Sequence, residues 1–295
     1  MKRFCYFLLV FILFGVTRFH AFADAYRDYI DAYGDLAVAQ QEIHGIPASI
    51  TLAQGLLESA AGRSALAREG NNHFGIKCHS GWEGPTMLRN DDAPDECFRV
   101  YESPEESFRD HSRFLLRKRY APLFELDPLD YAGWAQGLRQ CGYATDPNYA
   151  VRLITIIERY ALYLFDTPGG RSAEENTLFI QATLAASHPI RKSRGLHYVI
   201  AAPGDTYASL AKELKMDKKK LMRYNDARKD TKIKDWEEVY LQEKHEQGPE
   251  NVKTAVIGDG ESFHSIAQRY AMKLSVLRAL NPTASDTPGT RLRLR

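Results

Sequence analysis

The C-terminal third of this chain contains an internal repeat. Residues 204–211 (GDTYASLA) align without gaps with residues 260–267 (GESFHSIA), and the match continues to Asn225 and Asn281. In each copy one apolar run precedes the repeat and another follows it, with two short helices expected between them. The repeat therefore predicts two small βααβ modules joined by a short polar linker. These modules are expected at residues 197–242 and 253–295.

The preceding part of the chain, residues 24–165, is predicted to form a mainly helical domain. Residues that cap or open helices mark its helix starts, since Ser, Asp and Pro are favoured at these positions. The predicted starts are Pro47, Ser103, Asp127 and Asp146. Between residues 82 and 101 the helical period is lost, and a β-hairpin is expected there. The fold class is therefore α+β, with a small hairpin lobe on the helical domain and a linker at residues 166–196.

The N-terminus has the pattern of a targeting segment. Lys2 and Arg3 precede a short apolar run at residues 4–16, and Ala21-Phe22-Ala23 fits the small-residue cleavage pattern. The apolar run is too short to span a bilayer comfortably. We expect a signal peptide at residues 1–23, with an uncleaved anchor as the alternative. The mature chain would then have no membrane span and lie in the periplasm or cell envelope, or be secreted.

Export changes how the four cysteines are interpreted. Cys5 would leave with the signal peptide, and disulfides form in oxidising compartments. Cys78 and Cys97 flank the expected hairpin, so we predict that they pair and that Cys141 stays a buried free thiol. No Cys/His spacing resembles a metal site, and no cofactor is expected. Three of the nine histidines, His73, His79 and His111, are expected to be polar surface or core-edge residues rather than ligands.

Glu58 is the strongest candidate for a catalytic residue. It lies at the end of an otherwise apolar helix, in the run Gln54-Gly55-Leu56-Leu57-Glu58-Ser59. A turn rich in Gly and Asn follows at residues 71–77. Apolar surroundings disfavour the charged carboxylate and keep a proton available near neutral pH. General acids that cleave glycosidic bonds are arranged in this way. The net charge of +1 gives no indication of a nucleic-acid partner.

Three linked motifs carry a family resemblance. The segment 46–77, residues 98–101 (FRVY) and residues 142–150 (GYATDPNYA) occur in that order. They resemble the bacterial endo-β-N-acetylglucosaminidases of the autolysin and flagellar-hydrolase type, which act on peptidoglycan. The resemblance implies a lysozyme-like fold and cleavage of the β-1,4 bond on the reducing side of N-acetylglucosamine. One departure is Ala61, where family members often have Trp.

The second catalytic group is left open between two alternatives. The resemblance points to Asp91 or Asp92 as a base that activates water from about 6.5–9.5 Å away, with strand alternation turning one of them toward the cleft. The other alternative is attack by the acetamido group of the substrate, oriented by a tyrosine. Candidate residues for this orientation and for substrate binding are Tyr143, Tyr149, Asn72 and Phe74. For Phe74, packing in the core is an equally good interpretation.

The repeat modules resemble LysM modules, which bind glycans that contain N-acetylglucosamine. The resemblance implies a peptidoglycan hydrolase tethered to its glycan partner, with the modules apart from the chemistry. A muramidase or lytic transglycosylase on the same scaffold is the alternative enzyme. A non-catalytic cell-wall binding protein is the alternative outside enzymes. The sequence does not indicate an oligomeric state.

Overall fold

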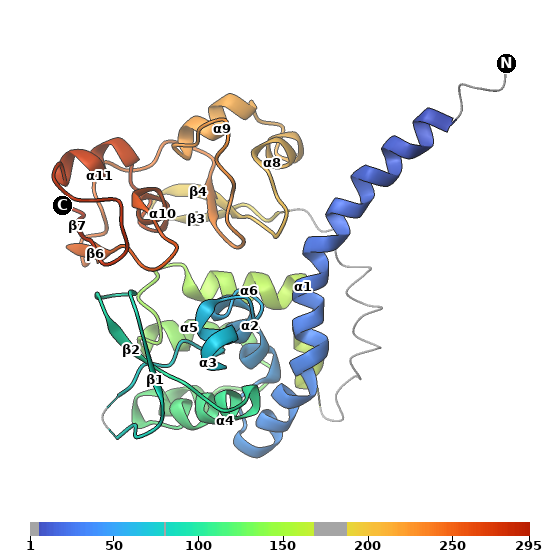
Figure 1. Cartoon of the computed structure of the whole chain (residues 1–295), viewed down its shortest axis with the longest axis vertical. Helices are drawn as coiled ribbons and strands as arrows, with labels where there is room; N and C mark the ends of the chain where they lie inside the picture. Colours follow the sequence, from blue (N-terminus) through green and yellow to red (C-terminus); the bar gives the residue numbers. More distant parts are fainter. Residues whose placement is uncertain (1–5, 80, 168–187) are drawn as a thin grey trace.

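The computed structural model describes residues 6–79, 81–167 and 188–295, with side-chain environments from residue 25 onward. A helical domain forms one half, and the C-terminal repeats pack against it as the other (Figure 1). The helical domain contains α1 (Tyr6–His44), α2 (Ala48–Glu58), α3 (Ala65–Gly70), β1 (Thr86–Arg89), β2 (Glu96–Arg99), α4 (Pro104–Leu115), the 3₁₀ helix η1 (Lys118–Glu125), α5 (Tyr131–Gln140), α6 (Tyr149–Arg159) and the 3₁₀ helix η2 (Leu162–Asp166).

Helix α2 lies at the centre of the helical domain. It contacts α1, α5, α6 and η2, and its residues from Ala48 to Leu56 are all buried. A helix that is apolar on every side has to be enclosed in this way. Pro47 precedes its first residue, as predicted, and Glu58 is its last residue. The buried helix α2 thus places Glu58 at its C-terminal end, where the helix reaches the surface of the domain.

Strands β1 and β2 form the expected antiparallel hairpin, with Leu88 opposite Cys97. Cys97 is joined by a disulfide to Cys78, with Cα atoms 5.3 Å apart, which is the predicted pairing. Cys141 is a free thiol and is partly buried. The disulfide ties the segment after the Asn-rich turn to the hairpin lobe.

Two of the predicted helix starts are wrong by several residues. Helix α4 begins at Pro104 after a capping Ser103, as predicted, but α5 and α6 begin at Tyr131 and Tyr149. The carboxylates of Asp127 and Asp146 instead accept hydrogen bonds from the backbone N–H two residues later. Each Asp-Pro pair therefore forms a turn that precedes the helix rather than its cap.

The two repeats have the predicted βααβ order, and the first has one additional strand, β3, before it. The elements of the first module are β3 (Arg191–Ser193), β4 (Leu196–Ile200), α8 (Tyr207–Glu213), α9 (Lys218–Tyr224) and β5 (Glu238–Tyr240); those of the second are β6 (Thr254–Val256), α10 (Phe263–Arg269), α11 (Leu274–Leu280) and β7 (Arg291–Arg293). The repeated Asn has the same role in both. The side chain of Asn225 bonds the backbone of Leu221 and Tyr240, and that of Asn281 bonds Leu277 and Arg293.

The segment before the first module differs from the expected linker. Asp166 is buried and accepts hydrogen bonds from the backbone and hydroxyl of Ser49, so it belongs to the helical domain. Residues 191–193, expected to be irregular, form β3, which pairs with β4. The stretch 178–186, which could not be assigned to strand or helix from the sequence, lies outside the described residues.

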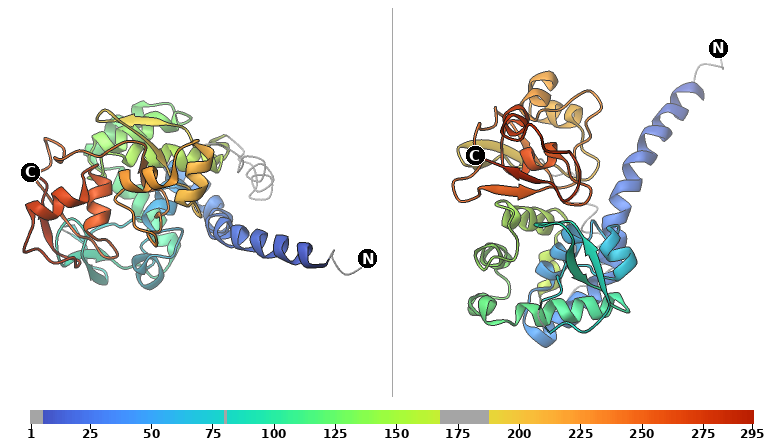
Figure 2. Two further views of the ribbon diagram at one scale, coloured as in Figure 1. Left: turned by 90° about the horizontal axis from the view of Figure 1, so that it is seen from above. Right: turned by 60° about the vertical axis from the view of Figure 1, so that its left-hand side comes forward.

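The modules are not separated from the helical domain, which corrects the tether prediction. Leu196, Tyr198, Ile200 and Tyr240 belong to the same apolar cluster as the core of the helical domain. The indole N–H of Trp236 donates to the hydroxyl of Tyr26 in α1 at 3.0 Å. The right-hand view in Figure 2 shows the modules packed on the helical domain. Burial of these apolar side chains, which a linker composition cannot reveal, holds the two halves together.

Helix α1 continues without a break through residues 6–23, the stretch predicted to be a signal peptide. Its N-terminal part projects beyond the rest of the molecule (Figures 1 and 2). Among the described residues, no helix is both long enough and apolar enough to cross a membrane.

Candidate active site

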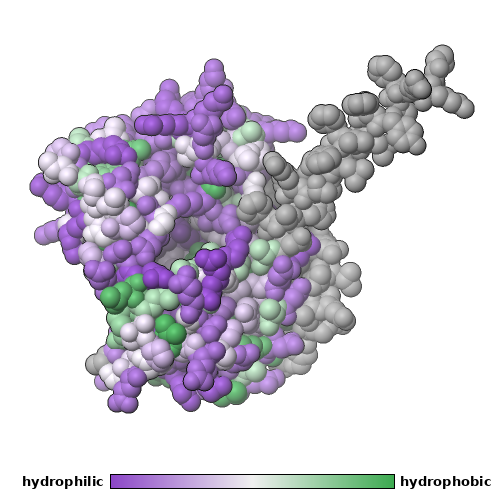
Figure 3. Space-filling model, in the orientation of Figure 1, coloured by the Kyte–Doolittle hydropathy of each residue, from purple (hydrophilic) through white to green (hydrophobic). Residues whose placement is uncertain are grey.

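Glu58 lines a cleft between the helical domain, the hairpin and the second module. The space-filling view shows a recess bordered by hydrophilic side chains between the two halves (Figure 3). The cleft has a volume of about 360 Å³, in the range of ligand sites. Charged and tyrosine residues on its lining include Glu58, Lys77, Asp91, Asp92, Arg119, Tyr143, Asp146, Tyr149, Arg152 and Arg269.

The carboxyl group of Glu58 keeps its proton to a higher pH than an ordinary glutamate. Burial raises its pKa to about 7, and the negative charges of Asp91 and Asp146 act in the same direction. A hydrogen bond from Tyr149 and the positive charge of Arg152 act in the opposite direction and are outweighed. A carboxyl with a pKa near the working pH is suited to protonate a leaving group.

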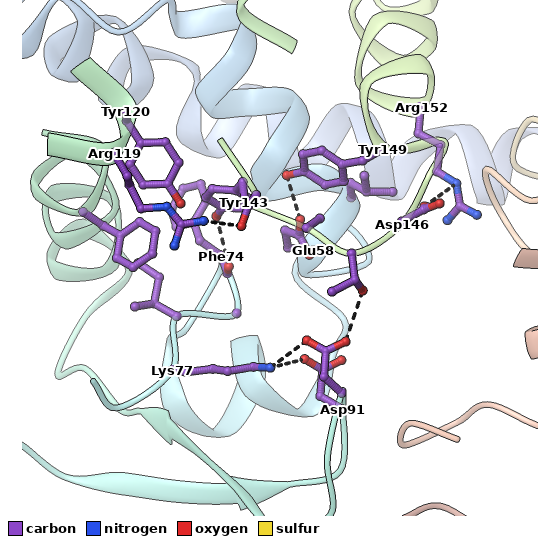
Figure 4. A pocket seen from close by; sticks show the side chains of 18 of the residues that line it. Glu58, Phe74, Lys77, Asp91, Arg119, Tyr120, Tyr143, Asp146, Tyr149 and Arg152 are labelled. Carbon is purple, nitrogen blue, oxygen red and sulfur yellow. Dashed lines mark hydrogen bonds and ion pairs between the residues drawn. The ribbon is translucent and has the colours of Figure 1, made fainter. Parts of the chain in front are cut away.

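A directed chain of hydrogen bonds ends at Glu58. The Nε2 atom of His111 lies 3.1 Å from the Gln54 amide oxygen, the Gln54 amide nitrogen donates to the Tyr149 hydroxyl at 2.9 Å, and Tyr149 donates to Glu58 at 2.9 Å. Burial lowers the pKa of His111 to about 3, so its ring is neutral and can donate from Nε2. The chain fixes Tyr149 as a donor and so orients the carboxyl; Figure 4 shows its last bond, from Tyr149 to Glu58.

His111 and Gln54 belong to the site, although no sequence pattern predicted a role for either residue. His111 and His73 are buried, so the expected surface or core-edge placement is wrong for both, whereas His79 is exposed. Gln54 lies one helical turn before Glu58, and this spacing is the signal that could have indicated a shared face. His111 lies far from both in sequence.

Asp91 and Asp92 both line the cleft, which differs from the expected alternation. They follow the end of β1 and lie in the hairpin turn, where strand alternation does not apply. Their carboxylates lie 2.9 and 3.0 Å from the ammonium of Lys77, which also contacts Glu96 at 2.9 Å. Burial by itself would lower the pKa of Lys77, but these three carboxylates raise it above its usual value. Lys77 is therefore the cation that holds this acidic cluster together.

Arg152 forms the opposite side of the cleft together with Asp146. Its guanidinium donates two hydrogen bonds of 2.9 Å to the fully buried carboxylate of Glu238, on β5 of the first module. Asp146 lies 3.3 Å away from the same guanidinium. The bidentate pair is a geometry that fixes an arginine in one orientation. A residue of the first module therefore positions a residue of the cleft.

The structure places the predicted substrate-binding residues at different positions relative to the cleft. Asn72 is buried, its amide bonds the backbone of Ile76 and Arg99, and it does not line the cleft, so this prediction is wrong. The Phe74 ring is buried and stacks on His111 with ring centres 3.9 Å apart, which is the packing interpretation. Tyr143 lines the cleft, stacks on Tyr149 at 5.7 Å and donates its hydroxyl to the Phe74 carbonyl.

At the Tyr143 end of the cleft, Arg119 lies over the Tyr120 ring at 4.9 Å. Its Nε donates to the carbonyl of Cys141 at 3.0 Å, which holds the guanidinium at the cleft rim. Figure 4 shows Arg119 and Tyr143 on one side of Glu58, and Asp146 and Arg152 on the other. The site thus has a proton donor in its middle and fixed cations on both sides.

Two family models match separate parts of the chain. Residues 34–162 match the model described as mannosyl-glycoprotein endo-beta-N-acetylglucosaminidase, and residues 200–234 match the LysM domain. The chain contains a glucosaminidase domain and a LysM domain. The cleft of Glu58 lies in the glucosaminidase domain, and the first module is the LysM domain. The second module repeats its βααβ order, and its assignment as LysM stays a prediction.

Two curated proteins and one solved structure are similar to this chain. The exo-glucosaminidase LytG of Bacillus subtilis is 33% identical over 170 residues, which are 52% of this chain and 58% of LytG. The peptidoglycan hydrolase FlgJ of Salmonella typhimurium is 34% identical over 146 residues, 45% of this chain and 46% of FlgJ. A solved N-acetylmuramoyl-L-alanine amidase of Staphylococcus aureus has 30% identity and a TM-score of 0.47, covering 52% of this chain and 47% of that one. The chain thus spans about half the length of these relatives.

Proposed function

We propose that this chain is a peptidoglycan hydrolase that cleaves the β-1,4 bond on the reducing side of N-acetylglucosamine, with Glu58 as general acid. The observation that carries the proposal is the Glu58 carboxyl, which lines the cleft of the glucosaminidase domain with a pKa raised to about 7. Two relatives with this domain are named as a glucosaminidase and a peptidoglycan hydrolase. The LysM domain supports a cell-wall glycan as the partner.

The second group of the reaction is proposed to be Asp91 or the acetamido group of the substrate. Asp91 lines the cleft and its charge acts on Glu58, as expected for a carboxylate across the bond to be cut. In this role it would activate water, with its carboxylate held 2.9 Å from the ammonium of Lys77. If the acetamido group attacks instead, Tyr143 or Tyr149 would orient it, because both tyrosines line the cleft beside Glu58.

The products of digestion test the bond that is cut. We expect mass spectrometry of digested sacculi to show fragments that end in a reducing N-acetylglucosamine. The proton from Glu58 would then have gone to the oxygen that leaves with the next sugar, and water would complete the new reducing end. Fragments ending in a reducing or an anhydro-muramic acid would contradict the proposal and support the muramidase or lytic transglycosylase alternative.

The pH dependence tests the role of Glu58 as an acid. We expect kcat/KM to fall as the pH rises through about 7, because Glu58 must carry its proton to act. The Tyr149 hydrogen bond favours the charged carboxylate and lowers this pKa, so Tyr149→Phe should move the alkaline limb to higher pH. The shift should be about one pH unit, since a hydrogen bond to a charged group contributes about 1.5 kcal/mol and one unit is 1.36 kcal/mol.

Tyr163→Phe is the matched control, since this tyrosine lies in η2 and does not line the cleft. Its profile should overlay that of the wild type. An alkaline limb that stays in place in Tyr149→Phe, or moves to lower pH, would show that the limb belongs to a group other than Glu58.

Export to the cell envelope is part of the same proposal. It is supported by the signal-peptide pattern of residues 1–23, the LysM domain and the Cys78–Cys97 disulfide, because disulfides persist in oxidising compartments. The N-terminal sequence of the exported protein is expected to start at Asp24. Protein retained in the cytoplasm with an intact N-terminus would contradict it.

A further inference from the structure

The second module contacts the glucosaminidase domain at the tip of the hairpin. The backbone N–H of Asp259 donates to the carbonyl of Asn90 at 3.0 Å. The Asp259 carboxylate accepts the Asn90 side-chain amide at 3.0 Å and its backbone N–H at 3.3 Å. Asn90 directly precedes Asp91 and Asp92, both on the cleft lining. The second module is thus bound to the loop that forms one side of the cleft.

The same module is also bound to the other side of the cleft, through β5. The backbone carbonyl of Gln268 in α10 accepts the Tyr240 hydroxyl at 3.0 Å, and the Gln268 side chain donates to the Glu238 carbonyl at 3.1 Å. Glu238 in turn holds Arg152 of α6. The helix α10 is therefore connected through β5 to α6, whereas the loop before α10 is connected to the hairpin.

Between these two attachments, Arg269 of α10 lines the cleft. Its guanidinium is ion-paired with Glu261 of the same module, and its side chain is 26% exposed. In the close view, the ribbon of the modules lies beyond Asp146, Arg152 and Asp91, on the side of the cleft away from Arg119 (Figure 4). The second module thus contacts both sides of the cleft at the end away from Arg119.

We propose that the second module forms an end wall of the cleft, so that the enzyme cleaves at the end of a glycan strand rather than in its middle. Cleavage in the middle needs a groove that lets the polymer leave on both sides of the reacting bond. With one side closed, only the sugars that fit between Glu58 and the wall at Arg269 can lie beyond the bond. The inference rests on the proposed hydrolase function and concerns its mode of action.

The test follows the length of long soluble glycan strands that carry a fluorescent label at their reducing ends. We expect the full-length wild-type protein to release small fragments from the start of the reaction, while at early times labelled strands of intermediate length stay rare. Release of the label in a small fragment would place the attack at the reducing end. Stepwise shortening of the labelled strand would place it at the other end, and both results support the wall.

A broad set of labelled fragments of all lengths at early times would overturn the inference while leaving the hydrolase function intact. A wild-type protein that cuts no strand would instead contradict the proposed function. The two failures are therefore distinct.

The double variant Glu238→Ala, Asp259→Ala removes the carboxylate that joins β5 to Arg152 and the carboxylate that bonds Asn90, and tests whether the module is the cause. We expect internal cuts, measured as labelled fragments of intermediate length, to rise about tenfold, which corresponds to 1.4 kcal/mol. Circular dichroism should be retained. The control Asp230→Ala, Glu246→Ala changes two exposed acids of the same modules and should keep the wild-type pattern. A folded double variant with unchanged products would overturn the wall.

Discussion

Replacing Glu58 by Gln is expected to lower turnover on sacculi by about two to four orders of magnitude, the usual contribution of a general acid. The amide keeps the size of the side chain but has no proton to give to the leaving oxygen, and it can still accept the hydrogen bond from Tyr149. Turbidity assays on sacculi measure the loss, and circular dichroism checks the fold. Near wild-type turnover would rule out Glu58 as the acid.

Two comparisons make this result specific. Glu69→Gln alters an exposed acid that pairs with Arg89 outside the cleft, and its activity should stay unchanged. Asp91→Asn and Asp92→Asn separate the two routes to the second group. Severe loss at Asp91 alone, with rescue by azide, supports a carboxylate base. Mild effects at both together with severe loss in Tyr143→Phe support the acetamido route.

Replacing Glu238 by Ala is expected to destabilise the whole protein by about 3 kcal/mol, because removal of one partner from a buried ion pair leaves the other charge uncompensated. Glu238 is fully buried against Arg152, which keeps Asp146 as a weaker partner, so the lower end of the usual 3–5 kcal/mol applies. Urea unfolding of the full-length protein measures the loss. Limited proteolysis should cut between the two halves sooner than in the wild type.

The matched control is Glu246→Ala, an exposed acid on the same half that pairs with Lys273. Exposed pairs contribute about 0–1 kcal/mol, so its unfolding midpoint should move little. If Glu238→Ala also leaves the midpoint in place, the buried pair does not hold the LysM domain to the glucosaminidase domain. The shared apolar cluster and the Trp236–Tyr26 hydrogen bond would then be the contacts that hold the two halves together.

The sequence by itself determined the local features of this protein. The repeated Asn225 and Asn281, the hairpin between Cys78 and Cys97 and the helix that ends at Glu58 were all predicted from residue patterns. Each depends on residues close together in the chain or on a motif repeated in it. Periodicity, caps and repeats report such short-range preferences directly.

The tertiary structure alone decided which distant residues meet. Three different helices carry His111, Gln54 and Tyr149. Their positions in the sequence do not predict that these residues form one series of hydrogen bonds to Glu58. The contact of Arg152 with Glu238 joins two domains that the sequence predicted to be connected only by a flexible linker. Such contacts arise because apolar faces of different elements are buried together. Polar groups that are buried with these faces are costly unless they form hydrogen bonds or ion pairs with one another.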